Sequence, residues 1–250
     1  MTRLVRWRSR ITNVQRDKLV TYGINQVRII KEFSYEEMVY FLLFGKKPSR
    51  IESRLLRAVI LSHCSHGITG QSTLATRMAA DCRSPFLNAA LGGFLVGSGT
   101  FHQGGLEMAM KELQSAITVP SIEEYVSKKL SRKQVIYGYG HRFHKHDPRA
   151  RCLMNLCRKH SFLGPNVTAA IQIDRILWRE KKVHMNIEAA CGSILLDMGF
   201  PPEIAALIIL IGRGPMFAAA YMERLASSKK VFQKIKVFDL VPAQKGKNHG

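Results

Sequence analysis

Several short groups of polar residues beside glycines have the side chains that acid–base chemistry and anion binding require. The densest is the stretch 138–149, GYGHRFHKHDPR, where a glycine-rich turn carries His141 and leads to Asp147 and Arg149. An imidazole can give and take a proton near neutral pH, and a guanidinium binds a carboxylate through two parallel hydrogen bonds. This stretch therefore indicates proton transfer beside a bound anion.

The other candidate residues lie far apart in the sequence and also stand beside glycines or apolar residues. They are His66-Gly67, His102-Gln103-Gly104-Gly105, Asn186-Ile187-Glu188 and Arg213. Burying a lone guanidinium is costly unless an anion meets it. Arg213 is therefore expected to pair with Asp197, with Glu223 or with a carboxylate of a ligand. Taken singly, each histidine also fits a structural or capping role, and we expect surface or supporting roles for His63, His144, His146 and His160.

The spacing of the histidines and cysteines does not predict a metal site. His141, His144 and His146 follow the pattern H-x2-H-x-H, which matches neither HExxH nor a Cys/His tetrad. The five cysteines include no CxxC pair and do not form a disulfide framework. We expect a reducing, cytoplasmic location and cysteines that are mostly small core residues. These are Cys64, Cys82, Cys152, Cys157 and Cys191.

The composition is that of a protein with a substantial core and a strongly basic surface. The 250 residues are 46% hydrophobic and carry a formal net charge of +20. This charge fits either nucleic-acid binding or a polyphosphorylated small-molecule ligand. The basic residues are dispersed, without an RNP-like aromatic motif or zinc-knuckle spacing, which favours the small ligand. Segment 1–14 lacks the apolar core of a secretory signal, and segment 84–106 is too polar to span a membrane.

Helix signals dominate the elements that must position these residues. Ser34 and Ser49 each precede acidic residues and an apolar run, so helices are expected at 35–44 and 50–66. Further helices are expected at 72–82, 85–97, 122–130, 148–159, 165–178 and 187–198. An apolar segment follows Pro202, and Gly212–Pro215 is expected to divide it into two helices. Strand candidates are limited to 4–14 and 237–241, so the predicted fold is all-α.

Taken in chain order, the polar groups match one known pattern. Its most specific part is the turn 138–141 followed by Asp147-Pro148-Arg149. The matching order includes His66 with Ser72, FHQGG at 101–105, Asn186-Ile187-Glu188, Gly212-Arg213, and the phrases FSYEEMVYFLLFGKKPS and LLDMGFPPEIA. Over nearly its whole length the chain resembles the citrate synthase superfamily. Its shortness and the phrase HGITGQSTLATR are most like the short citryl-CoA lyases and the carboxyl-terminal module of ATP-citrate lyase.

The resemblance implies both an architecture and a reaction. It implies an all-α fold in which a large helical domain, 1–105 with 189–250, is closed over by a smaller helical domain, 106–188. It implies a carbon–carbon lyase that cleaves citryl-CoA to acetyl-CoA and oxaloacetate through an enol(ate). The coenzyme A thioester is then a substrate, with no permanently bound cofactor or metal. Residues that bind coenzyme A are not assigned, although the basic clusters 128–133 and 142–146 could meet its phosphates.

By the same resemblance, each candidate residue takes a role. The catalytic residues would be Glu188 as the base at the acetyl methyl group, His102 as the donor to the thioester oxygen and His141 as the proton shuttle at the alcohol oxygen. The dicarboxylate would be held by His66, Arg149 and Arg213.

Two departures from the family pattern bear on activity. The family carboxylate is normally aspartate, and Glu188 is one methylene longer, so its carboxylate would be displaced by about 1 Å, a misplacement that can cost ~100-fold in rate. Gln103 stands between His102 and the Gly-Gly pair, which affects the register of that turn.

Three other functions therefore stay open at the level of sequence. The same site could condense an acyl-CoA with oxaloacetate to citrate or 2-methylcitrate. The chain could be a catalytically weak homologue that binds coenzyme A or a dicarboxylate, and nucleic-acid binding is the least favoured. The apolar segment 204–220 predicts a homodimer or higher homo-oligomer, with no membrane association.

Overall fold

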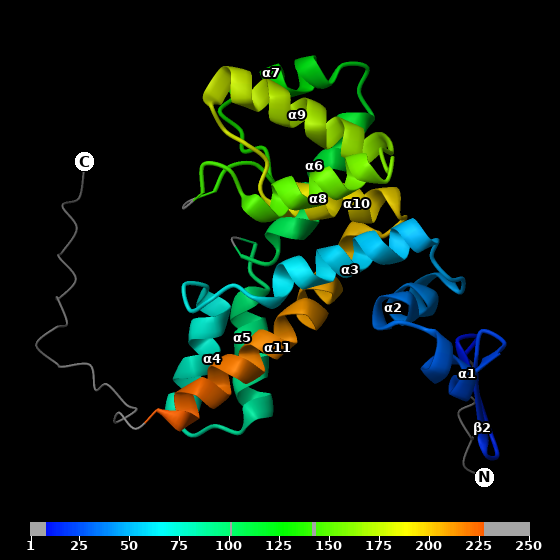
Figure 1. The fold of residues 1–250 in the computed structure, drawn as a ribbon. Helices are drawn as coiled ribbons and strands as arrows, with labels where there is room; N and C mark the ends of the chain where they lie inside the picture. Colours follow the sequence, from blue (N-terminus) through cyan, green and yellow to red (C-terminus); the bar gives the residue numbers. More distant parts are fainter. Residues whose placement is uncertain (1–8, 101, 142–143, 228–250) are drawn as a thin grey trace, which may run out of the picture. The chain divides into compact units, whose positions relative to one another are not determined.

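The computed structural model describes residues 9–100, 102–141 and 144–227, and these are mostly helical (Figure 1). The elements are β1 (Thr12–Gln15), β2 (Lys18–Thr21), β3 (Ile24–Asn25), α1 (Gln26–Glu32), α2 (Tyr35–Phe44), α3 (Arg50–Cys64), α4 (Gln71–Asp81), α5 (Phe86–Gly97), α6 (Gly105–Ile117), α7 (Ile122–Ser131), α8 (Pro148–Lys159), α9 (Pro165–Lys181), α10 (Ile187–Asp197), the 3-10 turn η1 (Pro202–Ile204) and α11 (Ala205–Ala226). The all-α prediction is confirmed. The strand candidate at 237–241, residues 4–8 of the other candidate and the basic residues of segment 1–8 lie outside the described residues.

The helix starts predicted from serine caps are confirmed. Ser34 and Ser49 each form a capping box with the glutamate three residues later, which satisfies two backbone N–H groups at the helix start. Helix α2 ends at Gly45, whose φ of 69° is readily adopted only by glycine. Helix α3 ends at Cys64, so His66 lies beyond the helix rather than in its last turn.

A small antiparallel sheet near the N-terminus is larger than the sequence predicted. Strands β1, β2 and β3 pair in sequence order, with Thr12 opposite Thr21. Each connection is a two-residue turn with positive φ, at Asp17 (57°) in the first and at Tyr22 and Gly23 (45° and 84°) in the second. The first turn contains no glycine, so the usual sequence signal of a hairpin is missing there.

The chain divides into two compact units. The first comprises the described residues of Met1–Ser65 together with Ser98–Arg213, and the second comprises His66–Gly97 with the described residues of Gly214–Gly250. In the first unit α10 lies in the core, where Ala189, Ala190 and Ile194 are fully buried. At Gly192 an added Cβ would lie 3.0 Å from Met110 Cγ, so α6 approaches α10 closely. The helix that carries Glu188 is therefore fixed by packing.

The second unit contains α4, α5 and the later part of α11. At Gly93 an added Cβ would collide with Thr76, which explains why a glycine is needed where α4 and α5 meet. Arg77 pairs with Glu223 at 2.6 Å, which joins α4 to α11. Apolar side chains on this unit are also exposed, including Leu74, Met78, Leu87, Leu91 and Leu95.

The expected division of the last apolar segment into two helices is wrong. Helix α11 runs without interruption from Ala205 to Ala226 and contains Pro215. Ile208 and Phe217, on either side of the proline, are fully buried, so packing outweighs the loss of one backbone hydrogen bond.

Pro202–Ala226 is the one described segment long and apolar enough to cross a membrane, a test that core helices of soluble proteins also pass. Because Ile208 and Phe217 are buried, less of segment 204–220 is exposed than the oligomer prediction assumed.

Candidate active site

The glycine-rich turn before His141 lies beside the start of α10. Gly140 N donates to the His184 carbonyl (2.8 Å), and Asn186 N donates to the Gly138 carbonyl (2.9 Å). The Asn186 amide also donates to the Gly140 carbonyl at 2.9 Å. Gly138 has a φ of +89°, and a Cβ there would lie 2.6 Å from the Ala189 methyl group. Two motifs that are far apart in the sequence are therefore joined through backbone contacts.

His141 is oriented by the backbone of its own turn. The His144 N–H donates to His141 Nδ1 at 3.1 Å, and the two imidazole rings lie 4.5 Å apart. Because Nδ1 accepts this hydrogen bond, a neutral His141 carries its proton on Nε2. In this arrangement His141 can donate a hydrogen bond from Nε2, whereas accepting a proton there requires the contact with His144 to open. Arg142 and Phe143, between the two histidines, lie outside the described residues.

Asp147 joins the start of α8 to the start of α10. Its buried carboxylate accepts from Arg149 Nε (3.0 Å), Arg149 Nη2 (2.8 Å) and Ile187 N (3.2 Å). Burial alone would raise the pKa of Asp147, but the hydrogen bonds and charge of Arg149 outweigh it and hold the pKa below the ordinary value. Arg149 is thereby fixed through one edge of its guanidinium, and its Nη1 group is left to bind an anion.

Glu188 lies one residue into α10 and has a different environment. Its backbone N–H donates to the Asn186 side chain at 2.9 Å, which caps the helix. Its carboxylate lies against Gly105, because a Cβ built on Gly105 would be 2.5 Å from Glu188 Oε1. Burial raises the pKa of Glu188 to about 7, against the opposing effects of the Asn186 hydrogen bond and the Arg149 charge. The structure thus places this carboxylate at the turn that follows His102.

The turn at 102–105 is held by its own backbone. His102 N and Gly104 N both donate to the Gly99 carbonyl, at 2.9 and 3.1 Å. Helix α6 then begins at Gly105, so the turn ends directly at the Glu188 carboxylate. Gln103 Nε2 is buried and has no partner among the described residues. Phe101, which begins the FHQGG motif, lies outside them.

Arg213 is buried, with 2% of its surface exposed, and has no carboxylate partner among the described residues. Its Nε donates to the His63 carbonyl at 2.8 Å, and its buried Nη1 has no partner among those residues. Burial, together with the Arg149 charge, lowers the pKa of Arg213 to about 10. The expected pairing with Asp197 is wrong, because Asp197 accepts instead from Asn166 N and Val167 N, both at 2.9 Å.

The alternative partner of Arg213 is occupied as well. Glu223 pairs with Arg77 in the second unit, so the expectation that it neutralises Arg213 is also wrong. An unpaired buried guanidinium is costly. Arg213 therefore has the environment expected of a group that binds a carboxylate of a ligand.

His63, for which a surface or supporting role was expected, is buried, with 4% of its surface exposed. Its Nδ1 lies 3.0 Å from the Val59 carbonyl, so Nδ1 carries the proton. Burial lowers the pKa of His63 to about 4, and the charges of Arg213 and Arg149 add to this effect. The sequence does contain the signal, because His63 lies four residues after Val59 on the buried stripe of α3.

The second unit contains His66, whose ring lies against Gly70. A Cβ added at Gly70 would be 2.8 Å from His66 Nδ1.

The expectation that most cysteines lie in the core is wrong. Cys157 and Cys191 are buried, Cys64 is intermediate, and Cys82 and Cys152 are exposed. Within the described ranges, no three His, Cys, Asp or Glu side chains form a group that could hold a metal ion.

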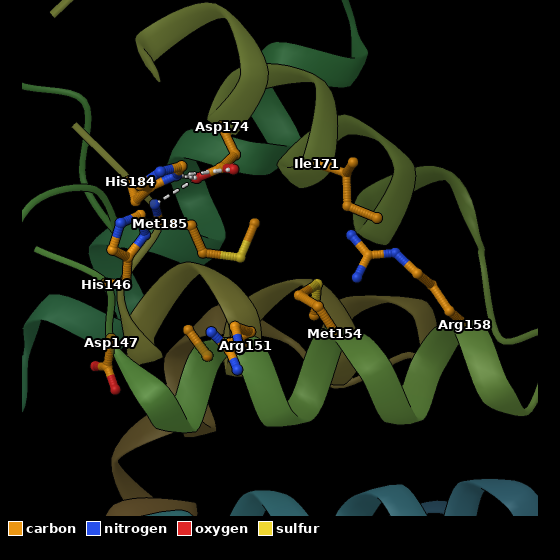
Figure 2. Close-up of a pocket in the computed structure, with 10 residues that line it drawn as sticks. His146, Asp147, Arg151, Met154, Arg158, Ile171, Asp174, His184 and Met185 are labelled. Atoms are coloured by element: carbon orange, nitrogen blue, oxygen red, sulfur yellow. Dashed lines mark hydrogen bonds and ion pairs between the residues drawn. The ribbon is translucent and has the colours of Figure 1, made fainter. Parts of the chain in front are cut away.

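A separate pocket of about 160 Å³ lies between α8 and α9 in the first unit (Figure 2). Asp174 accepts from Met185 N at 2.6 Å and contacts His184 Nδ1 at 3.2 Å. His184 stacks on Trp178 with the ring centres 4.2 Å apart. Arg151 and Arg158 of α8 line the same pocket. His146, which also lines it, has the supporting position that the sequence predicted.

Comparison with known proteins identifies the family of this chain. The citrate synthase, C-terminal domain family matches residues 23–235. This chain belongs to the citrate synthase family. Citrate synthase 2 of Bacillus subtilis is 26% identical over 216 residues, which cover 84% of this chain and 57% of that protein. The chain thus spans about half the length of the curated relatives it matches, from 40% to 58%.

Solved structures of the citrate synthase family and its relatives share the fold. Citryl-CoA lyase from Hydrogenobacter thermophilus is 29% identical, with a TM-score of 0.85 over 92% of this chain and 91% of that one. ATP citrate lyase from Methanothrix soehngenii, solved with citrate and coenzyme A, has a TM-score of 0.85 over 99% of this chain and 43% of its own, at 14% identity. The second likeness shows the fold alone. The predicted citrate-synthase-like fold is confirmed.

Proposed function

We propose that this protein cleaves citryl-CoA to acetyl-CoA and oxaloacetate. The observation that carries the proposal is the Glu188 carboxylate, which lies at the turn following His102 and has a pKa raised to about 7 by burial. An acid–base catalyst works best when its pKa is near the working pH. The similarity in length and fold to the citryl-CoA lyase of Hydrogenobacter thermophilus supports the same activity.

The proposed cleavage is a retro-aldol-type step, in which electron pairs shift from the hydroxyl oxygen toward the thioester oxygen. The tertiary hydroxyl of the citryl group gives its proton to His141, the oxygen forms the ketone of oxaloacetate, and the carbon–carbon bond breaks. The electron pair of that bond forms the enolate of acetyl-CoA, whose oxygen accepts a hydrogen bond from His102. Protonated Glu188 then donates its proton to the enolate carbon and completes the methyl group. Because a raised pKa keeps Glu188 partly protonated at neutral pH, this carboxyl suits the donor step.

His141 is proposed to act at the hydroxyl oxygen. In the arrangement described, its Nε2–H stabilises the oxygen as a hydrogen-bond donor, with the tautomer fixed by the His144 N–H. To take the hydroxyl proton, His141 must release the contact between His144 N and its Nδ1, so that both ring nitrogens can be protonated. Either role places the imidazole at the oxygen that changes between alcohol and ketone.

Arg149 and Arg213 are proposed to bind the carboxylates of the citryl group. Arg149 Nε donates to Asp147, and Arg213 Nε donates to the His63 carbonyl. Because both side chains are already ordered, substrate binding does not have to fix them. The positive charge of Arg149 contributes to lowering the pKa of Arg213, which indicates that the two guanidiniums act on a common region. Two adjacent cations suit a polycarboxylate. His66, in the second unit, stays a prediction from the sequence.

Coenzyme A carries several phosphate charges and would use part of the basic surface. Lys145 Nζ and Lys182 Nζ lie 5.6 and 5.3 Å from the centre of the Trp178 ring, beside the stacked His184. We propose that these lysines attract the phosphates of the thioester substrate, which would then be a substrate and not a bound cofactor. Raising the salt concentration from 50 to 200 mM should increase KM for citryl-CoA and leave kcat nearly unchanged.

The deciding experiment is turnover by the purified protein. Citryl-CoA should yield acetyl-CoA and oxaloacetate, followed by reduction of oxaloacetate in a coupled assay. Acetyl-CoA or propionyl-CoA with oxaloacetate tests condensation, since a catalyst accelerates both directions at one site. Turnover only in condensation would favour a citrate or 2-methylcitrate synthase. Absence of turnover with every acyl-CoA, with ligand still raising Tm, would favour a binding homologue instead.

The assembly and location of the protein complete the proposal. We propose a homodimer or higher homo-oligomer in the cytoplasm, supported by the exposed leucines of α5 in the second unit, Leu87, Leu91 and Leu95. Closure of a small domain, 106–188, over the rest of the chain is a further proposal that follows from the family. Light scattering of the purified protein tests the first of these, and scattering with and without substrate tests the second.

A further inference from the structure

The first residue of α6, Gly105, has no backbone reason to be a glycine. It is buried and helical, and its φ is not in the left-handed region that favours glycine. Alanine is the more favourable residue in a helix, because it restricts the unfolded chain and adds no polar group. The reason for a glycine must therefore lie in what a side chain would meet at this position.

A side chain at position 105 would meet the carboxylate of Glu188. A Cβ built on Gly105 would lie 2.5 Å from Oε1, 2.7 Å from Cδ and 2.8 Å from Oε2 of Glu188. All three distances are shorter than van der Waals contact. The carboxylate therefore occupies the volume that any other residue at position 105 would fill.

The surrounding helices leave little freedom to relieve such a collision by moving the backbone, so the Glu188 side chain itself would have to rotate out of this position. Glu188 belongs to α10, whose start is fixed by the Asn186 cap and by the Asp147 contact to Ile187 N. One turn further along, α10 meets α6 where a Cβ on Gly192 would lie 3.0 Å from Met110 Cγ. Moving α6 away from Glu188 would open a gap in this buried contact.

We propose that Gly105 is a positioning residue matched to Glu188: the volume left by the absent side chain seats the longer carboxylate beside the turn that carries His102. An aspartate at position 188 would end about one carbon–carbon bond, ~1.5 Å, short of this seat. An alanine at position 105 would exclude the glutamate from it. The catalytic consequence rests on the proposed function, whereas the steric match does not.

The match predicts a non-additive pair of substitutions. Gly105→Ala and Glu188→Asp should each lower kcat for citryl-CoA cleavage by about 100-fold through misplacement of the carboxylate, with KM changed by less than about threefold. In the double variant the added methyl group fills the volume that the shorter side chain vacates. Because the aspartate carboxylate does not reach the seat, kcat of the double variant should equal that of Glu188→Asp alone, about 100-fold below the wild type, with no further loss from the alanine. A loss in the double variant equal to the product of the two single losses would overturn the proposal.

A control variant separates the match from the general effect of replacing a helical glycine. At Gly92 of α5 an added Cβ meets nothing within 4 Å. Gly92→Ala should leave kcat unchanged, and its combination with Glu188→Asp should show the loss of Glu188→Asp alone. A recovery of activity in that combination would also contradict the proposal.

Thermal unfolding tests the match without relying on catalysis. Gly105→Ala should lower Tm by roughly 3–10 °C, the range expected for overpacking in a chain of this size, and adding Glu188→Asp should restore at least half of that loss. If Gly105→Ala alone is insoluble, recovery of soluble protein in the double variant is the supporting result, and continued insolubility overturns the match. If the wild type shows no turnover but the double variant recovers Tm in this way, the proposed function is wrong and the steric match between Gly105 and Glu188 is supported.

Discussion

Two carboxylates at the starts of neighbouring helices show how local environment decides between structure and reactivity. Asp147 precedes α8 and is buried, and Glu188 lies at the first turn of α10 and is partly buried. Asp147 accepts two hydrogen bonds from the Arg149 side chain, and its pKa is held low. Glu188 forms no ion pair with any cationic side chain of the described residues, and burial raises its pKa to about 7. The same functional group stays an anion at one site and, in the proposed mechanism, carries a proton at the other.

The difference depends on whether nearby cations or N–H donors offset the cost of burying a charged carboxylate. Moving a carboxylate out of water disfavours its charged form, and only a nearby cation or several N–H donors reverse that preference. At Asp147 the compensation is complete because Arg149 is two residues away and reaches back to it. At Glu188 the Arg149 charge acts from a greater distance, so burial dominates. Substitutions at each carboxylate and at its partners test this contrast.

The largest effect is expected from removing the proton carrier. Glu188→Gln keeps the size of the side chain but cannot donate a proton to the enolate, so kcat for citryl-CoA cleavage should fall by about 1000-fold. Steady-state kinetics with citryl-CoA measures this change. Glu180→Gln, at an exposed residue that pairs with Arg179, is the matched control and should retain full activity. A loss of less than tenfold in Glu188→Gln would remove Glu188 from the catalytic step.

Breaking the structural pair should have a smaller effect on rate and a larger effect on stability. Asp147→Asn removes the partner of Arg149 and weakens the link to Ile187 N, so kcat/KM should fall by about 100-fold. The free energy of unfolding should fall by roughly 2–3 kcal/mol, less than for a fully buried pair because Arg149 is partly exposed. Urea unfolding measures the second quantity. Unchanged stability would show that Asp147 does not hold the two helix starts together.

The two carboxylates should give opposite dependences of stability on pH. Because the pKa of Glu188 is raised from 4.5 to about 7, its contribution is fully present below pH 4.5 and is lost as pH rises through 7. The slope from this one group is at most about 1.4 kcal/mol per pH unit. Because the pKa of Asp147 is lowered from 3.8, its contribution is present above pH 3.8 and is lost as pH falls further. Glu188→Gln should flatten the curve between pH 4.5 and 7, and no change there would contradict the raised pKa.

The smallest effect is expected from the helix cap that faces Glu188. Asn186→Ala should cost about 1 kcal/mol of stability, and it should raise the pKa of Glu188 further because the Asn186 hydrogen bond lowers it. Asn25 caps α1 in the same way, through a 2.8 Å contact from Val27 N, at an exposed site. Asn25→Ala should cost a similar free energy and leave the pH–rate profile unchanged. Equal pH–rate profiles for the two variants would show that the Asn186 cap does not influence the pKa of Glu188.

The sequence predicted the starts of most helices of the site, because their signals are local, but it did not predict α6, which begins at Gly105. Serine caps, Pro148 and Pro165 at helix starts and Gly45 after a helix end all act within one turn, and the helices begin where these residues stand. The division of the last apolar segment at Pro215 was wrong, since burial of residues on both sides of the proline decided the outcome. Local signals could not weigh that packing against one lost hydrogen bond.

The environment of the site residues could not be predicted to the same extent. The pattern of motifs indicated Glu188, Arg149 and Arg213, but not that Asp147 would hold Arg149 or that Asp197 would be occupied by the start of α9. Gly105 and His63 matter through contacts with residues more than 80 positions away along the chain. Such contacts depend on how helices pack, and a single sequence gives no direct sign of them.

The central claim is that Glu188 titrates near neutrality while Asp147 does not. Carboxyl resonances of the protein labelled with carbon-13 at Glu and Asp side chains can be followed from pH 4 to 9, with Glu188→Gln and Asp147→Asn identifying the two signals. We expect a Glu188 pKa of about 7. We expect no shift of the Asp147 resonance, because its carboxylate stays ionised over the whole range. A Glu188 resonance that titrates near 4.5, as for an exposed glutamate, would contradict it.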